Sequence, residues 1–92
     1  MSDERAFRST IRYFRPEKAS GLTVADIPPR VTEHLGGLKQ LRVRAIVNGR
    51  EFVSNTMPAG GGKLALSLSK AILKELGLAV GDEADFEVER LT

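Results

Sequence analysis

The chain has no cysteine, no tryptophan, and only one histidine and one tyrosine among its 92 residues. The lack of cysteine excludes disulfides, thiolate metal sites and cysteine nucleophiles, and it fits a reducing compartment. A zinc site or a serine nucleophile with a histidine base would depend on His34 alone, and no second ligand or nucleophile motif accompanies it. We therefore expect a protein that is not an enzyme and that uses no metal and no cofactor.

Long apolar runs are also missing. No stretch approaches the ~20 apolar residues that a membrane helix needs, which excludes a membrane span. The first ten residues, MSDERAFRST, lack the apolar region of a secretory signal. With 41% hydrophobic and 28% charged residues, the composition is that of a soluble globular protein. We expect a single domain over residues 1–92, located in the cytoplasm.

Alternation of apolar and polar residues predicts the strands. Residues 6–14 alternate, with Phe7 and Ile11 on one face. The strongest local signal is Asn48-Gly49 between two alternating runs, because both residues tolerate the positive φ of a type I′ turn. We expect a hairpin over residues 41–57, closed at its far end by Pro58 and the following glycines. Further strands are expected at residues 22–27, 63–68 and 84–91, and a polar connection at 15–21.

Two short helices are expected between these strands. Pro28-Pro29 cannot lie in a central strand, but the pair can open a helix that ends at Gly36. Ser67 or Ser69 can cap a second helix that ends at Gly77. We expect three side chains of this second helix to face inward: Ile72, Leu73 and Leu76.

An internal repeat at an offset of 41 residues relates the two helical regions. It places Leu35-Gly36 on Leu76-Gly77, and both copies read strand, short helix, glycine, strand. Two such units in a short chain imply a pseudo-twofold packing around one core. Because closure leaves the fewest strand edges, we predict a mainly β fold: a single six-stranded barrel-like domain with two short helices and duplicated strand–helix–strand units.

Three glycines followed by a lysine, Gly60, Gly61, Gly62 and Lys63, suggest a phosphate-binding loop. The nucleotide-binding form of that loop needs an earlier glycine where Met57 stands, a Ser or Thr where Leu64 stands, and a helix rather than a strand afterwards. We interpret the glycines as a sharp turn between two barrel strands. Anion binding by successive backbone N–H groups beside Lys63 stays open as a second interpretation.

Positive charge gathers in the first half of the chain. Residues 1–50 carry ten Lys/Arg against five Asp/Glu, and residues 51–92 carry four against seven. A basic face could bind nucleic acid through five arginines: Arg8, Arg12, Arg42, Arg44 and Arg50. The alternative is that Arg42 and Arg44 pair across strands with Glu87 and Glu89, which neutralises the field. Four Phe and one Tyr give little support for a base-stacking platform.

Several motifs together resemble a known family. They are VADIPPRV, Gly36-Gly37, VRAIVNGREF, MPAGGGKLALSLSKAILKELGL and GDEADFEVE, and they span nearly the whole chain. On these residues the chain is similar to the bacterial domain of unknown function 1905. The resemblance implies a small β-barrel with two short helices and no established activity. The shorter stretch LSLSKAILKELGLAVGDEADFEVE also resembles the swapped-hairpin, AbrB-like regulators of antitoxin type, which complete their barrel by dimerisation.

We expect, on these grounds, a bacterial binding or interaction module without catalytic activity. Its partner would be a small ligand or a protein, and DNA binding in the manner of an antitoxin-like transcription regulator is the alternative. Because the repeat lets one chain supply both halves of the barrel, a monomer is favoured over a dimer.

Overall fold

The structure is a computed structural model in which residues 5–15 and 21–91 are described. Both ends of the expected 1–92 domain and most of the expected connection at 15–21 lie outside the described residues. The elements follow one another along the described chain as β1 (Ala6–Tyr13), β2 (Thr23–Ile27), α1 (Pro29–Leu35), β3 (Arg42–Val47), β4 (Arg50–Gly60), β5 (Lys63–Leu68), α2 (Lys70–Leu76) and β6 (Glu83–Arg90).

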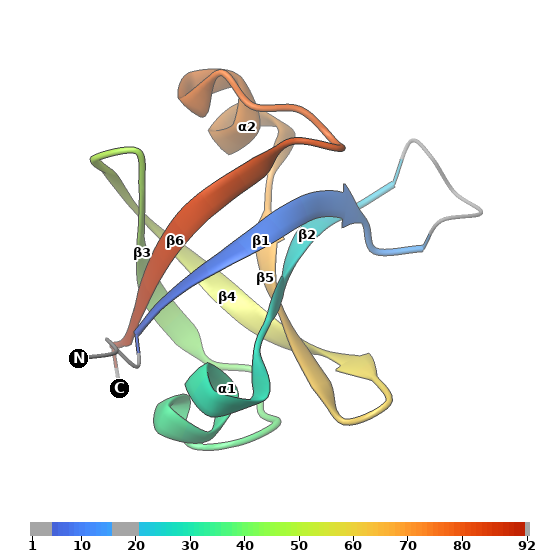
Figure 1. Ribbon diagram of the computed structural model, residues 1–92, viewed down its shortest axis with the longest axis vertical. Helices are drawn as coiled ribbons and strands as arrows, with labels where there is room; N and C mark the ends of the chain where they lie inside the picture. Colours follow the sequence, from blue (N-terminus) through green and yellow to red (C-terminus); the bar gives the residue numbers. More distant parts are fainter. Residues whose placement is uncertain (1–4, 16–20, 92) are drawn as a thin grey trace.

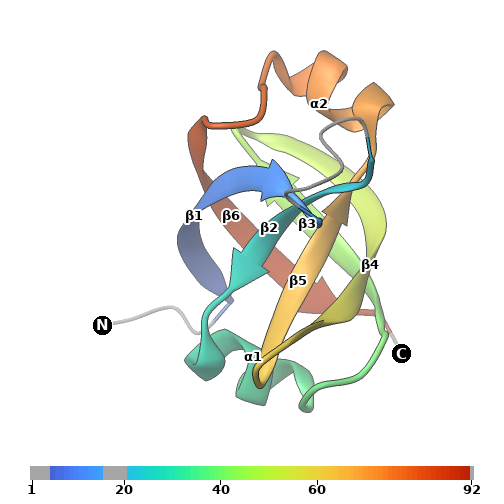
Figure 2. The ribbon, with the colours of Figure 1, turned by 90° about the vertical axis from the view of Figure 1, so that its right-hand side faces the viewer.

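The strands close into a barrel in the order β1-β2-β5-β4-β3-β6, and every neighbouring pair is antiparallel. Figures 1 and 2 show that α1 and α2 lie at opposite ends of this barrel. Neither of these two helices of the described chain is long and apolar enough to cross a membrane. The mainly β, six-stranded barrel with two short helices that the sequence predicts is confirmed.

The core fills the inside of the barrel mostly with alternate strand residues, and β2 and β5 also bury the intervening Val24 and Ala65. Val43, Ala45 and Val47 of β3 are fully buried. On β6 the buried residues are Ala84, Phe86 and Val88. The rings of Phe7 and Phe86 stack with centroids 5.3 Å apart and an interplanar angle of 13°, which joins β1 to β6 inside the core. The period-2 pattern of the sequence therefore identifies the buried face correctly.

Local turn and cap residues behave as their chemistry predicts. Asn48 and Gly49 have φ of 52° and 78° and form the two-residue loop between β3 and β4. Pro28 precedes α1 as its N-cap, with Pro29 at the first helical position. Ser69, rather than Ser67, caps α2 by accepting a hydrogen bond from the Ile72 N–H at 3.1 Å.

The three α2 side chains that the sequence predicts to face inward do so: Leu73 is buried, and Ile72 and Leu76 are partly buried and packed against the core. One expectation from the sequence needs correction. Pro58 does not close its strand, because β4 continues to Gly60. The pairing of β4 with β3 ends at Asn55, so no β3 residue needs the N–H that Pro58 lacks. Pro58 instead lies opposite Leu64 of β5, at a register shift that extends to Gly60.

The pairing register obeys a pseudo-twofold relation. Adding 41 to the number of a β2 residue and subtracting 41 from that of its β5 partner converts the pair Thr23↔Leu68 into the pair Ile27↔Leu64. Both pairs occur. The same operation maps the part of the β3–β6 ladder from Ala45↔Val88 to Val47↔Phe86 onto itself about the pair Ile46↔Glu87. The helices α1 and α2 are related by the same offset. The duplication that the sequence predicts is thus built into the hydrogen-bonding pattern of the barrel.

The first strand of each half also repeats, which the sequence reasoning missed. β1 pairs with β2 and β6, and β4 pairs with β5 and β3, so that β1 and β4 are equivalent at an offset of 45 residues. This offset places Phe7 on Phe52 and Ser9 on Ser54, two identities in a Phe-X-Ser pattern. The paired residues Ile11 and Ala25 of β1 and β2 are 14 positions apart, whereas the equivalent Thr56 and Leu66 of β4 and β5 are 10 apart, and this difference of four hid the repeat.

Candidate functional site

The glycine triplet makes the turn between β4 and β5. Gly60, Gly61 and Gly62 have φ of 82°, 61° and 75°, a region that residues with a Cβ rarely adopt. Lys63 then begins β5 directly, so no helix N-terminus follows the glycines. The interpretation of the triplet as a turn between strands is confirmed, and anion binding by this loop stays a prediction.

Lys63 lies at a surface hollow of about 290 Å³ together with Arg8. We call this depression, between β1 and β2, the β1–β2 hollow. The structure therefore brings together one residue of the predicted anion loop and one of the predicted arginine patch. The lining residues are Arg8, Ser9, Asp26, Ile27, Pro28, Pro29 and Lys63.

The hollow exists because β1 and β2 pair over only part of their length. Backbone pairing joins Ile11–Tyr13 to Thr23–Ala25, and closer to its start β1 pairs with β6 instead. In the other half, β4 and β5 separate at the equivalent point, where Ser54 Oγ donates a hydrogen bond to the Ser67 carbonyl at 2.6 Å. The equivalent Ser9 makes no side-chain hydrogen bond to any described residue. The split beside Ser9 therefore stays open to solvent.

Asp26 is the carboxylate of the hollow, and Arg12 fixes its position. Arg12 Nε and Nη2 donate to the two carboxylate oxygens at 2.8 Å each. These hydrogen bonds are the main cause that lowers the pKa of Asp26; burial opposes the shift, and the charges of Arg12 and Lys63 support it. The pKa of Arg12 is raised, first by the same hydrogen bond. Asp26 is therefore a charged acceptor at neutral pH.

The two cations that line the hollow differ in their partners. Arg8 pairs with Asp85 at 3.1 Å and lies 3.8 Å from Glu83, and its side chain is 58% exposed. Exposed pairs of this kind contribute little free energy, so a ligand can displace them at small cost. Lys63 forms no ion pair with the described part of the chain. Its ammonium acts on Asp26 only through its charge, without a direct contact to a described residue.

Comparison with known sequences bears on the whole barrel. The sequence model of a family described as Domain of unknown function (DUF1905) matches residues 7–88, which include both helices and nearly all of the six strands. The chain belongs to this family. No curated protein matches it. Since the family description names no activity, the function of this DUF1905 chain has to be argued from its own surface.

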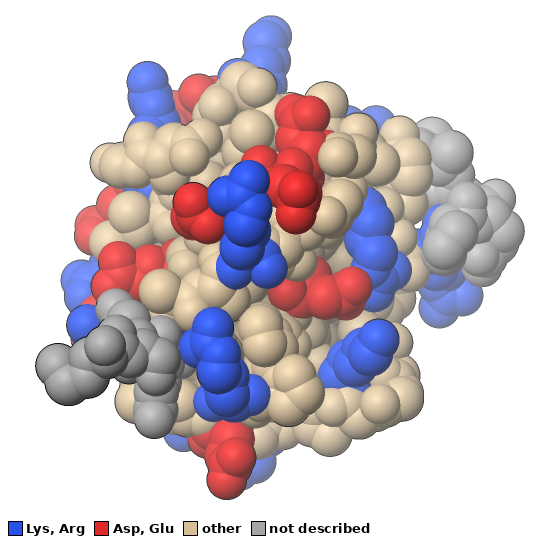
Figure 3. Space-filling model, viewed as in Figure 1, with Lys and Arg blue, Asp and Glu red and all other residues tan. Residues whose placement is uncertain are grey.

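The predicted arginine patch of the DUF1905 barrel is divided among three strands and largely paired. Arg8 and Arg12 lie on β1, Arg42 and Arg44 on β3, and Arg50 on β4. Figure 3 shows basic and acidic side chains interleaved on the face it displays. Arg5 and Arg8 pair with Glu87, Asp85 and Glu83 of β6, so the basic first half and the acidic second half neutralise each other in part.

Arg44 and Glu89 form the cross-strand pair that the sequence predicts. They lie opposite each other in the β3–β6 ladder and are joined by a hydrogen bond from Arg44 Nη2, with Glu51 3.7 Å from Arg44. This hydrogen bond is the first cause that raises the pKa of Arg44 and lowers that of Glu89. The expected partner role of Glu87 is wrong, because Glu87 lies opposite Ile46 and pairs with Arg5.

Two arginines of the predicted patch have no ion pair with the described residues, Arg42 and Arg50. Arg42 is an exposed residue at the start of β3. Arg50 follows the β3–β4 turn and lines a smaller hollow of about 180 Å³ between β4 and α2. The structure thus separates Arg50 from the β1–β2 hollow. In residues 5–15 and 21–91, no group of three His, Cys, Asp or Glu side chains is placed to hold a metal ion.

Sequence reasoning missed Ser9, Asp26 and the two prolines as lining residues of the hollow. Ser9 carried a usable signal, because it repeats as Ser54 in the Phe-X-Ser pattern. Asp26 is a lone carboxylate in an apolar strand, TVADI, which could also have marked it. Their proximity to Lys63 depends on the antiparallel register of β2 with β5, where Asp26 lies opposite Ala65.

Proposed function

We propose that this DUF1905 domain is a non-catalytic binding module that takes a small anionic ligand in the β1–β2 hollow. One contrast carries the proposal. The same strand split occurs twice in the duplicated barrel, and a hydrogen bond from the Ser54 hydroxyl closes one copy. The copy at Ser9 is open and lies beside Lys63, which forms no ion pair with a described residue. Because only one of the two equivalent copies is open, the duplicated architecture alone does not account for the opening, and we assign it to ligand binding.

The side chains of the hollow favour an anion that also carries hydrogen-bond donors. Lys63 and Arg8 supply positive charge, and the Ser9 hydroxyl can donate to an oxygen of the ligand. Asp26 is an acceptor held in its charged form, so the group beside it should be a hydroxyl or an amine. Pro28 and Pro29 offer an apolar wall. Phosphorylated or carboxylated polyols match this chemistry.

The direction of the pKa shifts supports a role in binding rather than catalysis. Asp26 and Glu89 both have lowered pKa values because each accepts a hydrogen bond from an arginine. A carboxylate that acts as a general acid or base near neutral pH needs its pKa raised instead. A substrate turned over at a rate that Asp26→Asn abolishes would contradict the non-catalytic part of the proposal.

Titration with glycerol 3-phosphate and with inorganic phosphate, followed by amide chemical shifts, tests the site. We expect saturable shifts at residues 8–9, 26 and 60–63, with tighter binding of glycerol 3-phosphate. Lys63→Gln should weaken binding about tenfold through loss of a charged hydrogen-bond donor. Lys74→Gln on exposed α2 is the matched control and should bind like the wild type. Saturable shifts in neither titration would overturn the proposal.

Duplex DNA binding is the second candidate. The observation that favours it is that Arg42 and Arg50 form no ion pair with a described residue. If it is right, affinity should fall steeply with salt, and Arg42→Glu or Arg44→Glu should weaken it. No interaction with duplex DNA at low salt would eliminate this candidate. Lys63→Gln separates the two functions if it weakens the affinity for one of the two ligands, DNA or glycerol 3-phosphate, and not for the other.

We also propose that the protein acts as a monomer in the bacterial cytoplasm. The described strands close the barrel within one chain, which supports a monomer because no second copy is needed to complete it. The family resemblance and the lack of cysteine favour the setting. Sedimentation that gives the mass of a dimer at micromolar concentration would contradict the monomer.

A further inference from the structure

We propose that the hollow between β4 and α2 is a second binding site, which takes a free apolar α-amino acid. It lies apart from the β1–β2 hollow and shares no lining residue with it. Its lining consists of Arg50, Glu51, Phe52, Ile72, Glu75 and Leu76, and its volume is about 180 Å³. This volume is below that of pockets for drug-sized ligands, and is suited to one hydrophobic side chain.

The floor of this hollow is apolar and incompletely covered. Phe52, Ile72 and Leu76 are partly buried and pack against the core. Their counterparts under the pseudo-twofold relation are Phe7, Val31 and Leu35, which are 5%, 0% and 2% exposed. The duplicated barrel therefore buries this set fully in one half and leaves it partly open in the other. An apolar side chain that fills the hollow would remove this remaining surface from water.

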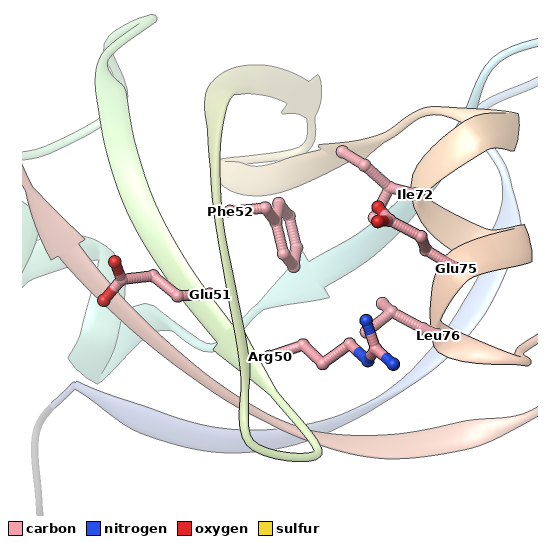
Figure 4. A pocket seen from close by; sticks show the side chains of 6 residues that line it. All are labelled: Arg50, Glu51, Phe52, Ile72, Glu75 and Leu76. Carbon is pink, nitrogen blue, oxygen red and sulfur yellow. The ribbon is translucent and has the colours of Figure 1, made fainter.

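Charges of opposite sign stand at the rim. Figure 4 shows the side chains of Arg50 and Glu75 on the side of β4 that faces α2, with the ring of Phe52 between the two elements, and Glu51 on the opposite side of β4. Glu51 lies 3.7 Å from Arg44, so the Glu51 carboxylate already has an ion-pair partner. Neither Arg50 nor Glu75 forms an ion pair with a described residue. One cation and one anion are thus available to a ligand.

The duplication explains why Arg50 has no ion-pair partner in residues 5–15 and 21–91. Its counterpart Arg5 lies 3.8 Å from Glu87 of β6. The position equivalent to Glu87 in the other half is Ile46 of β3, which has no charge to offer. The arginine is retained in both copies while its carboxylate is present in only one. A carboxylate supplied by a ligand would restore the missing partner of Arg50.

These features together define the ligand. An apolar amino acid has a carboxylate for Arg50, an ammonium for Glu75 and a side chain for the floor formed by Phe52, Ile72 and Leu76. A protein partner would need more apolar surface around the hollow than the structure offers. The large exposed hydrophobic residues of the described chain, Leu22, Leu38, Val53, Val80 and Leu91, are absent from its lining. The charged rim favours a small zwitterion.

Titration of the whole protein with L-leucine, followed by amide chemical shifts, tests the site. We expect saturable shifts at Phe52, Ile72, Glu75 and Leu76. Leucinamide lacks the carboxylate and 4-methylpentanoate lacks the ammonium, so each should bind about tenfold more weakly than leucine. Glycine, which has no side chain to fill the hollow, should cause no saturable shift. Equal binding of leucine and leucinamide would overturn the proposal.

Two variants test which ligand group each charged side chain binds. Arg50→Gln should abolish the preference for leucine over leucinamide, and Glu75→Gln should abolish the preference over 4-methylpentanoate. Arg42→Gln and Glu33→Gln change exposed charges outside the hollow and should preserve both preferences. If N-acetyl-leucinamide binds more tightly than leucine, the hollow accepts a side chain of a protein partner and the amino-acid proposal is wrong. Phosphate binding at the β1–β2 hollow is unaffected by either result.

Discussion

Arg12 bonds both carboxylate oxygens of Asp26 at 2.8 Å, just beyond the point where the backbone pairing of β1 and β2 ends. Arg12 also donates to the carbonyls of Tyr13 and Phe14 at 3.0 and 3.2 Å. The guanidinium therefore joins the end of β1 to Asp26 of β2, a residue that lies beyond the backbone pairing of these two strands. It also sets the orientation of the carboxylate that lines the β1–β2 hollow.

Replacement of this carboxylate should remove a contribution to stability that depends on pH. The pKa of Asp26 in the folded protein is lowered from its ordinary 3.8, so the unfolded chain binds its proton more readily. The contribution of Asp26 to stability is fully present above about pH 5 and is lost as pH falls through the folded-state pKa. Asp26→Asn should cost about 1 kcal/mol or less at neutral pH, since the pair is partly exposed.

Urea unfolding of both proteins at neutral pH and at about pH 2.5 provides the measurement. The difference between wild type and Asp26→Asn should shrink at the lower pH. Asp85→Asn, which alters the far more exposed pair with Arg8, is the control and should change stability less. A difference for Asp26→Asn that is the same at both pH values would show that the ion pair is not its cause.

The two equivalent phenylalanines should differ in what they contribute. Phe7 is 5% exposed and stacks on Phe86, whereas Phe52 is only partly buried. Phe7→Ala should therefore lower the free energy of unfolding by about 3–5 kcal/mol, the cost of a large cavity. Phe52→Ala should cost about 1–2 kcal/mol, because water already reaches part of its ring. Denaturant midpoints of the two variants compare them directly, and equal losses would contradict the difference between the halves.

Thr56 carries a buried hydroxyl in one half of the barrel, and the equivalent position in the other half has none. Its Oγ1 accepts from the Leu41 N–H at 3.0 Å and donates to the Lys39 carbonyl at 2.9 Å, whereas the equivalent residue is Ile11. Thr56→Val keeps the shape but leaves those backbone groups without this partner. We expect a loss of about 1–3 kcal/mol in thermal or urea unfolding. Thr10→Val, at an exposed position of β1, should stay within about 0.5 kcal/mol of the wild type.

Substitutions in the glycine turn should lower stability, whereas substitution of the adjacent Lys63 should weaken ligand binding. Gly62 has a φ of 75° and nothing within 4 Å of an added Cβ, so Gly62→Ala should cost about 1 kcal/mol of stability through backbone strain alone. Lys63→Gln should change the free energy of unfolding by less than about 0.5 kcal/mol, because its ammonium forms no ion pair with a described residue and acts on Asp26 only through its charge. Unfolding measurements beside the glycerol 3-phosphate titration distinguish the two roles. A Gly62→Ala protein as stable as the wild type would refute the turn interpretation.

Residues whose conformation depends on near neighbours were predictable from the sequence. Asn48-Gly49 fixes its own turn, Pro29 and Gly36 bound α1, and the alternation around Val43 identifies a buried face. In each case a few adjacent φ values or the two-residue period of a strand decides the outcome. The 41-residue repeat added the pseudo-twofold architecture, because a repeated pattern folds in a repeated way.

The candidate sites could not be predicted in this way. Lys63 and Arg8 are 55 positions apart in the sequence, and they meet only because β2 pairs with β5 on one side and with β1 on the other. The sequence also gave no sign that Arg50 would lie beside α2 while Arg44 pairs with Glu89. Ion pairs and hollows of this kind depend on strand register, which long-range packing sets.

The sequence by itself determines a duplicated β-barrel with short helices. The signals that specify it, which are turn glycines, prolines and side-chain alternation, each act over only a few residues. Tertiary structure alone decides which copy of each repeated feature is closed. Among the described residues, the Ser54 side chain has a hydrogen-bond partner and that of Ser9 has none, and Arg5 has an ion pair while Arg50 has none. The physical reason is that each contact depends on a partner from another strand, and the two halves present different partners at equivalent positions.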